Sequence, residues 1–353
     1  MKMDFGVSIG RNDRIDQISD LAISAEKWGF SHLGFVDSQN QSRDIYVMMA
    51  VAAQATKRIR LWQTVTVPST RHPSVTVNAT ATVNELSGGR AFLGLGAGMN
   101  AVETMGMKPS RIKDLRELVE FTKKYIVGDK ARWKGTIMQS DWVKDPFKIY
   151  LNAGGPKSTE LAGELADGVI FMGGPSSVMK WKMKHIEMGA TRAGRDLSEI
   201  DIVVRSNIYV ASSKKDSHGE LVSHVSPYAG LPVFNSNDSE IVSIYKEVEN
   251  EQPGILDEIE KAQKAISEEA KKHGGPPGFD PWHQKPNPPW AHLVTQRMID
   301  SVHLTGNVEE ICEGVERYAQ LGITSVMPAV YSMIDKESVI SQIGKEIIPK
   351  FQR

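Results

Sequence analysis

Glycines at alternate positions, Gly94, Gly96 and Gly98, close a short apolar run of this chain. Because glycine lacks a Cβ atom, a flat ring or another backbone can approach such a stretch closely, and N–H groups beyond a strand can bind an anion. The run therefore predicts a ligand site at a strand end. Its glycine spacing loosely matches a dinucleotide fingerprint, which we reject because no acidic residue closes a following strand.

A second glycine segment lies where a later apolar run leads into a predicted helix. Free N–H groups at a helix start, aided by the helix dipole and a serine hydroxyl, suit a phosphate group. The residues concerned are Asn152, Gly154, Gly155 and Ser158. Gly173 and Gly174 follow the next apolar run and offer a second set of donors. Both segments are equally compatible with ordinary turn and capping chemistry.

His72 is the candidate for substrate contact or proton transfer outside the glycine segments, and it lies between Arg71 and Pro73 at a predicted helix start. Imidazole changes its protonation near neutral pH, which suits acid–base work. A histidine that caps the helix through local hydrogen bonds is the alternative. Histidines and carboxylates show no compact metal-ligand spacing elsewhere, so we expect no metal.

Composition limits the classes of function. The 353 residues are 40% hydrophobic and 24% charged, with a formal net charge of -1. This balance gives no electrostatic reason to expect nucleic acid or an anionic membrane as a partner. The single cysteine, Cys312, excludes a disulfide framework, and the amino terminus lacks an apolar signal region. We therefore expect a cytoplasmic protein that does not enter a membrane.

The elements that must position these residues follow a strand-then-helix rhythm, which predicts parallel strands joined by crossover helices. Strands are expected at residues 5–9, 32–36, 59–66, 91–95, 147–152, 168–172, 200–211 and 324–330. Helices are expected over about 13–28, 44–55, 73–86, 112–126, 157–165, 178–193 and 336–347. Eight such units favour an α/β fold, a closed (β/α)8 TIM barrel that makes residues 1–353 a single domain.

Residues 212–291 interrupt this rhythm between the seventh and eighth strands. They contain a charged helical stretch over 240–272 and then a segment rich in proline and glycine. Because loops after barrel strands cluster at the catalytic mouth, this insertion is expected to be a substrate lid or, equally, a dimerisation arm. Its aromatic and imidazole side chains, Trp282, His283 and Trp290, are the expected substrate contacts.

Three stretches of the chain resemble the luciferase-like family of flavin-dependent oxidoreductases. They read WGFSHLGFVDSQNQSRDIY, RIRLWQTVTVPSTRHPSVTVNATATVNELSGGRAFLGLGAG and YLNAGGPKSTELAGELADGVIFMG. The family includes bacterial luciferase, two-component monooxygenases, and methylenetetrahydromethanopterin reductase with related enzymes that use the deazaflavin coenzyme F420. The resemblance covers roughly residues 2–210 and 300–345 and leaves the insertion out.

The resemblance implies which residues hold the cofactor. In the family a bulge in the third strand, often with a non-proline cis peptide, lies behind the central flavin ring, and Thr64, Val65 and Thr66 match it here. The exit of the fourth strand matches with Gly96, Ala97 and Gly98. The cofactor phosphate is placed at the glycine segment 152–158, with 173–174 as a second set of donors.

Two departures from the family bear on mechanism. The F420-dependent alcohol and sugar dehydrogenases of the family carry a histidine after the second strand and a glutamate after the fourth, where this chain has Ser38 and Met99. Removal of a hydroxyl proton would therefore lack its usual base, unless Glu103 or His72 substitutes. We assign Ser38 and His72 to the catalytic positions and expect simple alcohol oxidation to be disfavoured.

The function that the resemblance implies is that of a two-component monooxygenase, in which reduced FMN and O2 act on a small organic substrate. No NAD(P)H fingerprint is visible, which suggests a separate flavin reductase as partner, and family members are often homodimers. The first alternative is a coenzyme F420-dependent reductase or dehydrogenase that transfers a hydride. A flavin-binding barrel without turnover is the second. A phosphate-binding aldolase ranks last because no lysine ends a predicted strand.

Overall fold

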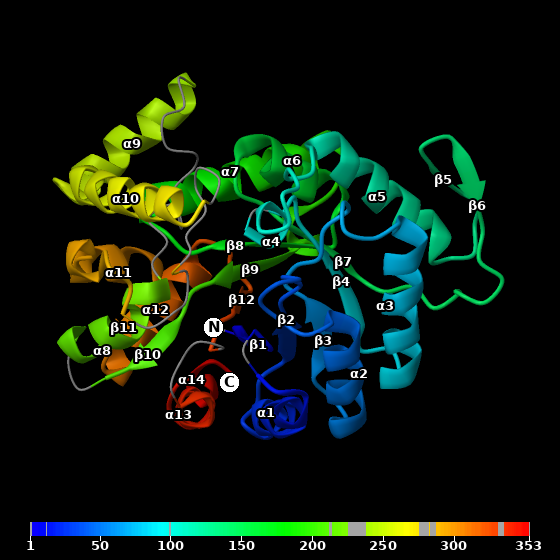
Figure 1. Cartoon of the computed structure of the whole chain (residues 1–353), viewed down its shortest axis with the longest axis horizontal. Helices are drawn as coiled ribbons and strands as arrows, with labels where there is room; N and C mark the ends of the chain where they lie inside the picture. Colours follow the sequence, from blue (N-terminus) through cyan, green and yellow to red (C-terminus); the bar gives the residue numbers. More distant parts are fainter. Residues whose placement is uncertain are drawn as a thin grey trace.

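Eight parallel strands form a closed barrel that is wrapped by helices (Figure 1). The computed structural model describes residues 2–11, 13–98, 100–211, 214–224, 238–274, 282, 287–330 and 335–352. Around the ring, the strands follow the order β1, β12, β9, β8, β7, β4, β3, β2. The predicted (β/α)8 barrel is thus confirmed.

The barrel strands and their helices alternate along the chain. The strands are β1 (Asp4–Ile9), β2 (His32–Phe35), β3 (Arg60–Gln63), β4 (Ala91–Leu95), β7 (Ile149–Asn152), β8 (Gly168–Met172), β9 (Asp201–Arg205) and β12 (Ser325–Val326). The helices that cover them are α1 (Ile15–Lys27), α2 (Ile45–Ala55), α3 (Pro73–Ser87), α5 (Ile112–Tyr125), α6 (Pro156–Leu165), α7 (Ser176–Arg192), α12 (Val308–Gln320) and α13 (Lys336–Glu346).

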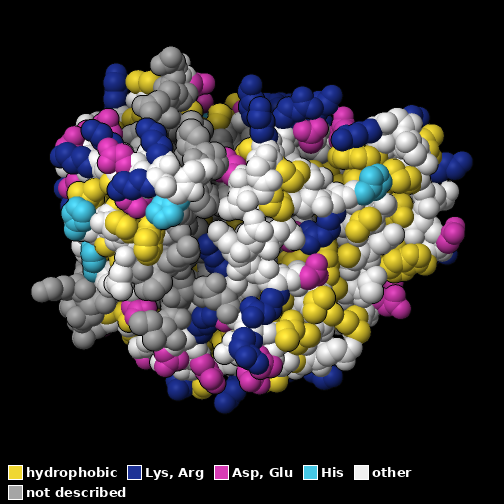
Figure 2. Space-filling view, in the orientation of Figure 1, with side chains coloured by type: hydrophobic (Ala, Val, Ile, Leu, Met, Phe, Trp, Pro, Cys, Tyr) yellow, Lys and Arg dark blue, Asp and Glu magenta, His cyan; other side chains and the backbone are white. Residues whose placement is uncertain are grey.

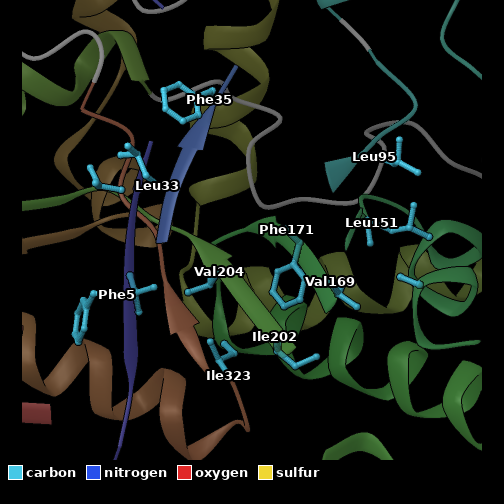
Figure 3. Close-up of a cluster of buried hydrophobic side chains, with 14 of the residues drawn as sticks. Phe5, Leu33, Phe35, Leu95, Leu151, Val169, Phe171, Ile202, Val204 and Ile323 are labelled. Atoms are coloured by element: carbon cyan, nitrogen blue, oxygen red, sulfur yellow. The ribbon is translucent and has the colours of Figure 1, made fainter. Parts of the chain in front are cut away.

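The main core lies between the strands and the surrounding helices. Alternate residues of each strand point outward into this core. Phe5, Phe35 and Phe171 are examples; each is at most 2% exposed and packs against Leu, Ile and Val side chains (Figure 3). Strands that are buried on both faces read as continuous apolar runs, which is why short runs in the sequence sufficed to locate them.

A second cluster fills the inside of the barrel; five of its six members come from different barrel strands, and Met327 directly follows β12. They are Trp62, Phe92, Tyr150, Ile170, Val203 and Met327. Because strand side chains alternate between faces, these residues define which positions point inward along each strand. The next inward positions towards the carboxyl ends of the strands therefore face the mouth of the barrel.

Three predicted strands differ from the structure: 200–211, 59–66 and 324–330, of which the last is reduced to Ser325–Val326 in β12. The expected strand 200–211 is two strands, because β9 ends at Arg205 and β10 (Ile208–Val210) pairs instead with β11 (Leu304–Gly306). The expected strand 59–66 stops at Gln63. A hairpin of β5 (Ala131–Trp133) and β6 (Thr136–Met138) was not predicted; it turns through Lys134 and Gly135, both with positive φ.

The insertion packs on one side of the barrel as a helical layer (Figure 1). Its helices are α8 (Lys214–Leu221), α9 (Ser239–Glu251) and α10 (Ile255–Lys272), and α11 (Gln296–Val302) follows it in the chain. Short elements elsewhere are α4 (Asn100–Glu103) and α14 (Ile348–Phe351). Helix α9 docks on α7, where a Glu251 carboxylate oxygen accepts from the Ser177 N–H at 2.9 Å. The role of the insertion as a lid or a dimer arm stays a prediction.

Two surface properties bear on the expected partners. None of the helices in the described part of the chain combines the length and apolar character needed to cross a bilayer. Hydrophobic side chains gather on the face over α2 and α3, where Val47 and Val75 are each 53% exposed (Figure 2). The expected homodimer stays a prediction, and this face is where we expect it to form.

Candidate cofactor and substrate site

The end of β3 departs from regular strand geometry at the predicted bulge. A non-proline cis peptide bond joins Thr64 and Val65, which confirms the unusual backbone expected at this position. Beyond it the chain rejoins β4, since the Thr66 N–H donates to the Gly94 carbonyl at 2.9 Å and the Gly96 N–H donates to the Thr66 carbonyl at 2.9 Å. The side chain of Val65 is partly exposed and packs on the interior cluster.

The glycines of β4 make room for this bulge. A Cβ atom on Gly96 would lie 2.4 Å from Val65 Cγ2, and one on Gly94 would lie 1.9 Å from the Gln63 carbonyl oxygen. Gly98 has a φ of 76°, and Ala97 accepts the Ser110 N–H through its carbonyl at 2.7 Å. We predicted that these glycines allow a ligand to approach. In the structure they allow the third and fourth strands to pack closely at the mouth.

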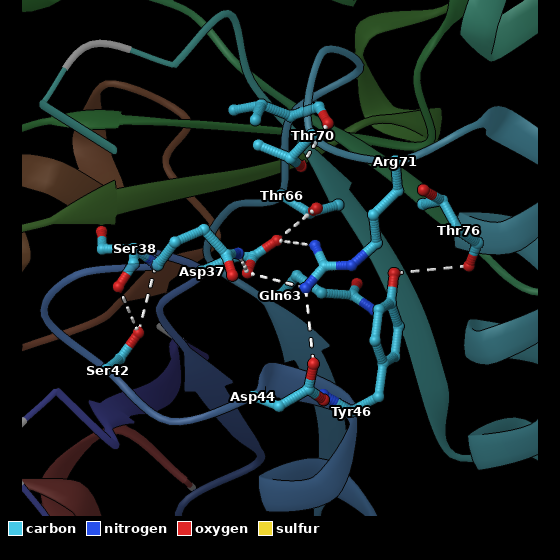
Figure 4. Close-up of polar contacts among 12 residues, drawn as sticks. Asp37, Ser38, Ser42, Asp44, Tyr46, Gln63, Thr66, Thr70, Arg71 and Thr76 are labelled. Carbon is cyan, nitrogen blue, oxygen red and sulfur yellow. Dashed lines mark hydrogen bonds and ion pairs between the residues drawn. The ribbon is translucent and has the colours of Figure 1, made fainter. Parts of the chain in front are cut away.

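A buried carboxylate ties the loops after β2 and β3 together (Figure 4). The Asp37 side chain, 2% exposed, accepts hydrogen bonds from Thr66 Oγ1 at 2.6 Å, Gln39 Nε2 at 2.6 Å and both terminal nitrogens of Arg71. Arg71 also reaches Asp44, the N-cap residue of α2, at 3.6 Å. Because each Asp37 oxygen already accepts two hydrogen bonds, Asp37 holds the cis segment in place and is not a free base.

Ser38 and His72 lie at the mouth, but neither is arranged as a paired catalytic group. The backbone of Ser38 bonds to the Ser42 hydroxyl, which closes the loop after β2. His72 is exposed and is the N-cap residue of α3, where its Nδ1 accepts from the Ser74 N–H at 3.3 Å. The structure thus gives His72 the capping role considered from the sequence, and a catalytic role for either residue stays a prediction.

The glycine segment after β7 is open to solvent. Gly154 and Gly155 have no heavy atom within 4 Å of the position that a Cβ would occupy. Ser158, in the first turn of α6, accepts from the N–H groups of both glycines at 3.2 and 3.1 Å. Asn152, the last residue of β7, is exposed beside them. The segment therefore places a helix start, a hydroxyl and two glycine N–H groups on the mouth side; the N–H groups donate to Ser158 here, and a phosphate would have to replace that hydroxyl as their acceptor.

Gly173 and Gly174 do not form an equivalent second set of donors. The Gly173 N–H donates to the Arg205 carbonyl at 3.0 Å, and a Cβ there would lie 2.7 Å from the Val302 carbonyl oxygen. Gly174 lines a cleft of about 620 Å³ between the start of α7 and α12, on the outer side of the barrel. The start of α7 is already capped by Glu251. The Gly173 N–H is therefore not available to a phosphate, which corrects the prediction for Gly173, and a binding role for Gly174 stays a prediction.

The aromatic residues expected to contact substrate do not converge on the mouth. Trp290 is 1% exposed and is part of the apolar core. Trp282 packs against the same core, where Glu269 of α10 lies close enough to share a hydrogen bond. Trp290 is thus a packing residue of the insertion, which corrects the prediction for it, because burial within the helical layer leaves it no face towards a ligand. His283 lies outside the described residues.

Two further groups lie at the mouth: Glu103, which the sequence offered only as a substitute base, and Arg205, which was not predicted from the sequence. Glu103 ends α4, which follows β4, and partial burial raises the pKa of its carboxyl group. Arg205 ends β9 two positions after the inward-facing Val203. The alternation of Asp201, Val203 and Arg205 was the available signal, and it was missed because the predicted strand continued through Arg205 to residue 211.

Comparison with known proteins identifies the family. The family model described as luciferase-like monooxygenase matches residues 3–325. This chain belongs to that family. One luciferase-like relative, the 5,10-methylenetetrahydromethanopterin reductase of Methanolobus tindarius, is 29% identical over 355 residues, which cover 98% of this chain and 100% of the relative. The chain is accordingly an oxidoreductase of the luciferase-like family.

Solved luciferase-like structures share the barrel. The coenzyme F420-dependent tetrahydromethanopterin reductase from Methanopyrus kandleri has a TM-score of 0.76 at 24% identity, with 99% of this chain and 100% of that chain covered. The oxygenating constituent of 3,6-diketocamphane monooxygenase from Pseudomonas putida, in complex with FMN, has a TM-score of 0.64 at 17% identity, with 99% of each chain covered.

Proposed function

We propose that this protein is a coenzyme F420-dependent reductase that transfers a hydride to a small organic substrate. The observation that carries the proposal is the combination of the glycine-lined bulge at Thr64–Val65 with the sterically open helix start at Gly154, Gly155 and Ser158. The first suits a flat ring and the second a phosphate. The relatives favour F420 over FMN, since the F420-dependent glucose-6-phosphate dehydrogenase of Nakamurella multipartita is 30% identical over 214 residues, which cover 54% of this chain.

The residues that would hold the cofactor come from adjacent strands of the ring. Val65, Gly96 and Gly98 would support the ring system from β3 and β4, and Asn152 with the 154–158 segment would bind the phosphate from β7. Since β3, β4 and β7 are consecutive neighbours in the barrel, one elongated ligand can span them. When bound there, F420 supplies a hydride donor or acceptor.

Reduction fits the described side chains better than alcohol oxidation does. Oxidation of an alcohol needs a base at the hydroxyl, and the loop after β2 offers only Ser38 and an Asp37 whose oxygens are occupied. Reduction needs a proton donor instead. Glu103 suits this role because burial raises the pKa of its carboxyl group, so a larger fraction carries a proton near neutral pH. Met99 lies outside the described residues.

The monooxygenase that uses reduced FMN, O2 and a separate flavin reductase is the second candidate. Its support is the shared barrel of the FMN-bound monooxygenase from Pseudomonas putida, at lower identity and TM-score than the F420-dependent reductase structure. A flavin-binding barrel without turnover would need a site that binds cofactor and lacks a proton donor. Glu103 at the mouth argues against that alternative.

Anaerobic titration with reduced F420 and, separately, with FMNH2 tests the proposal. We expect reduced F420 to bind at least tenfold more tightly and FMNH2 to give no transient flavin peroxide when mixed rapidly with O2. Tight FMNH2 binding with such a transient would instead establish the monooxygenase. Binding of neither cofactor would contradict both candidates.

A further inference from the structure

Two arginine side chains lie at the mouth, one on β9, opposite the bulge, and one after β1, two strands from the bulge in the ring. Arg205 ends β9, and because Val203 belongs to the cluster inside the barrel, Arg205 also points inward. It is partly exposed to solvent. Arg11 follows β1 directly and is 8% exposed. The strands that carry them, β9 and β1, are separated in the ring only by the two-residue strand β12.

The closed ring places Arg205 opposite the bulge. Strands β3 and β9 are four places apart in either direction around the eight-stranded barrel, so they face each other across the mouth. Thr64 points inward from the end of β3, where its hydroxyl lies 3.2 Å from that of the inward-facing Ser8. If a cofactor ring is bound at Thr64–Val65, a substrate lying on that ring would therefore have Arg205 on the side that faces away from the bulge.

Charge at the mouth is unevenly distributed. The carboxylate of Asp37 is engaged by Arg71, and that of Asp13 is engaged by Lys336 and by the Gly10 N–H at 2.7 Å. Arg11 and Arg205 both have contacts with the surrounding chain. Desolvation, with repulsion from Arg11, lowers the pKa of Arg205 to about 10. Both guanidiniums therefore stay positive at neutral pH and repel each other, which favours an anion beside them.

The neighbouring histidine adds no charge of its own. Burial, aided by the Arg205 charge, lowers the pKa of His303 to about 4. Its Nδ1 accepts from the Asn207 N–H at 3.1 Å, which holds the ring as a neutral tautomer beside the end of β9. The positive charge on this side of the mouth is therefore that of the two arginines.

We propose that Arg205 and Arg11 bind an oxyanion, a carboxylate or a phosphate, on the substrate, so that the enzyme acts on an anionic organic molecule. Guanidinium groups bind such groups through paired N–H donors. This inference rests on the proposed function in one respect. It takes the reacting carbon of the substrate to lie between the cofactor ring and Arg205. The cofactor phosphate has a separate place beside β7, two strands away from β9.

Calorimetric titration of the F420-saturated protein tests the inference with three probes: benzoate, its uncharged isostere benzamide, and inorganic phosphate. We expect benzoate to bind at least tenfold more tightly than benzamide and phosphate to compete with benzoate. Arg205→Met should weaken benzoate at least tenfold, and Arg205→Lys should weaken it less because the charge remains. Arg11→Met should weaken it severalfold. F420 affinity should change less than twofold in all three.

A matched control and the contrary outcomes separate the inference from the proposed function. Arg132→Met removes an exposed arginine of the β5–β6 hairpin and should change none of the affinities. Equal binding of benzoate and benzamide, no anion binding by the wild type, or weaker F420 binding by folded Arg205→Met would overturn the inference. Arg205-dependent benzoate binding by a protein that does not bind F420 would overturn the proposed function alone.

Discussion

At the scale of single residues, the carboxyl group of Glu103 is the described side chain best suited to donate a proton at the mouth. It follows the same strand as the family's usual glutamate, which in this chain is replaced by Met99. Position in the sequence alone could not favour Glu103, because its suitability depends on the burial that raises the pKa of its carboxyl group.

Glu103→Gln should lower kcat for F420-dependent reduction at least tenfold while leaving the affinity for F420 unchanged, because the amide keeps the shape but cannot donate the proton. Single-turnover oxidation of reduced F420, followed across pH, measures this. The wild-type rate should fall as pH rises through the raised pKa of Glu103. The rate of the variant should not show this fall. Glu85→Gln, on the exposed side of α3, is the control. If the rate of Glu103→Gln still falls over the same pH range, Glu103 is not the proton donor.

The Asp37–Arg71 pair gives a prediction for stability. Asp37→Asn leaves the Arg71 guanidinium, 15% exposed, without its nearest carboxylate. Breaking a buried pair costs about 3–5 kcal/mol in the free energy of unfolding when the remaining charge has no other partner; we expect a smaller loss here, because Asp44 still lies 3.6 Å from Arg71. Urea denaturation measures the loss. The double variant Asp37→Asn/Arg71→Met should recover part of it, and losses that simply add would show that the two residues do not act as a pair.

At the scale of elements, local patterns located most strands because parallel barrel strands are apolar on both faces. Residues 200–211 show where this fails. Ser206 and Asn207 interrupt the run, and both are buried by contacts with Val302 and His303, which lie 96 residues away, beyond the insertion. Such a break depends on tertiary partners that a local pattern does not contain. The same applies to β11, which is a strand only because β10 lies beside it.

The close approach of β3 and β4 is testable through one glycine. Gly96→Ala would bring a methyl group to 2.4 Å from Val65 Cγ2. Overpacking of this kind costs about 1–3 kcal/mol and should displace the bulge, so both thermal stability and F420 affinity should fall. Adding Val65→Ala should restore the stability, since it removes the clashing carbon. If stability recovers without affinity, Val65 itself contacts the cofactor; if neither recovers, the clash is not the cause.

At the scale of the whole molecule, two buried histidines link stability to pH. His32 sits at the opposite end of the barrel from the mouth, where it accepts from Trp62 Nε1 at 3.1 Å and bonds to Ser325 Oγ at 2.7 Å. Burial lowers the pKa of His32 to about 3 and that of His303 to about 4. Unfolded histidines titrate near about 6.5, so below that pH the unfolded chain binds protons that the folded protein cannot.

The free energy of unfolding should therefore fall as pH drops below about 6.5, by about 1.4 kcal/mol per pH unit for each of the two histidines, until their folded pKa values are reached. Urea denaturation between pH 4.5 and pH 7.5, a range of about three units, measures the slope. His32→Asn should reduce the slope, and the exposed His292→Asn should not. A flat profile would contradict the assignment of neutral buried rings.

The order in which the ring is assembled has a consequence for biosynthesis. Strand β12 consists of Ser325 and Val326, and it pairs with β1 on one side and with β9 on the other. A nascent chain therefore carries two unpaired strand edges, one at β1 and one at β9, until residues 325–326 leave the ribosome. Exposed edges of this kind invite pairing with other chains. Chaperone demand and truncation sensitivity should both concentrate in this final segment, far in sequence from the residues that bind the ligand.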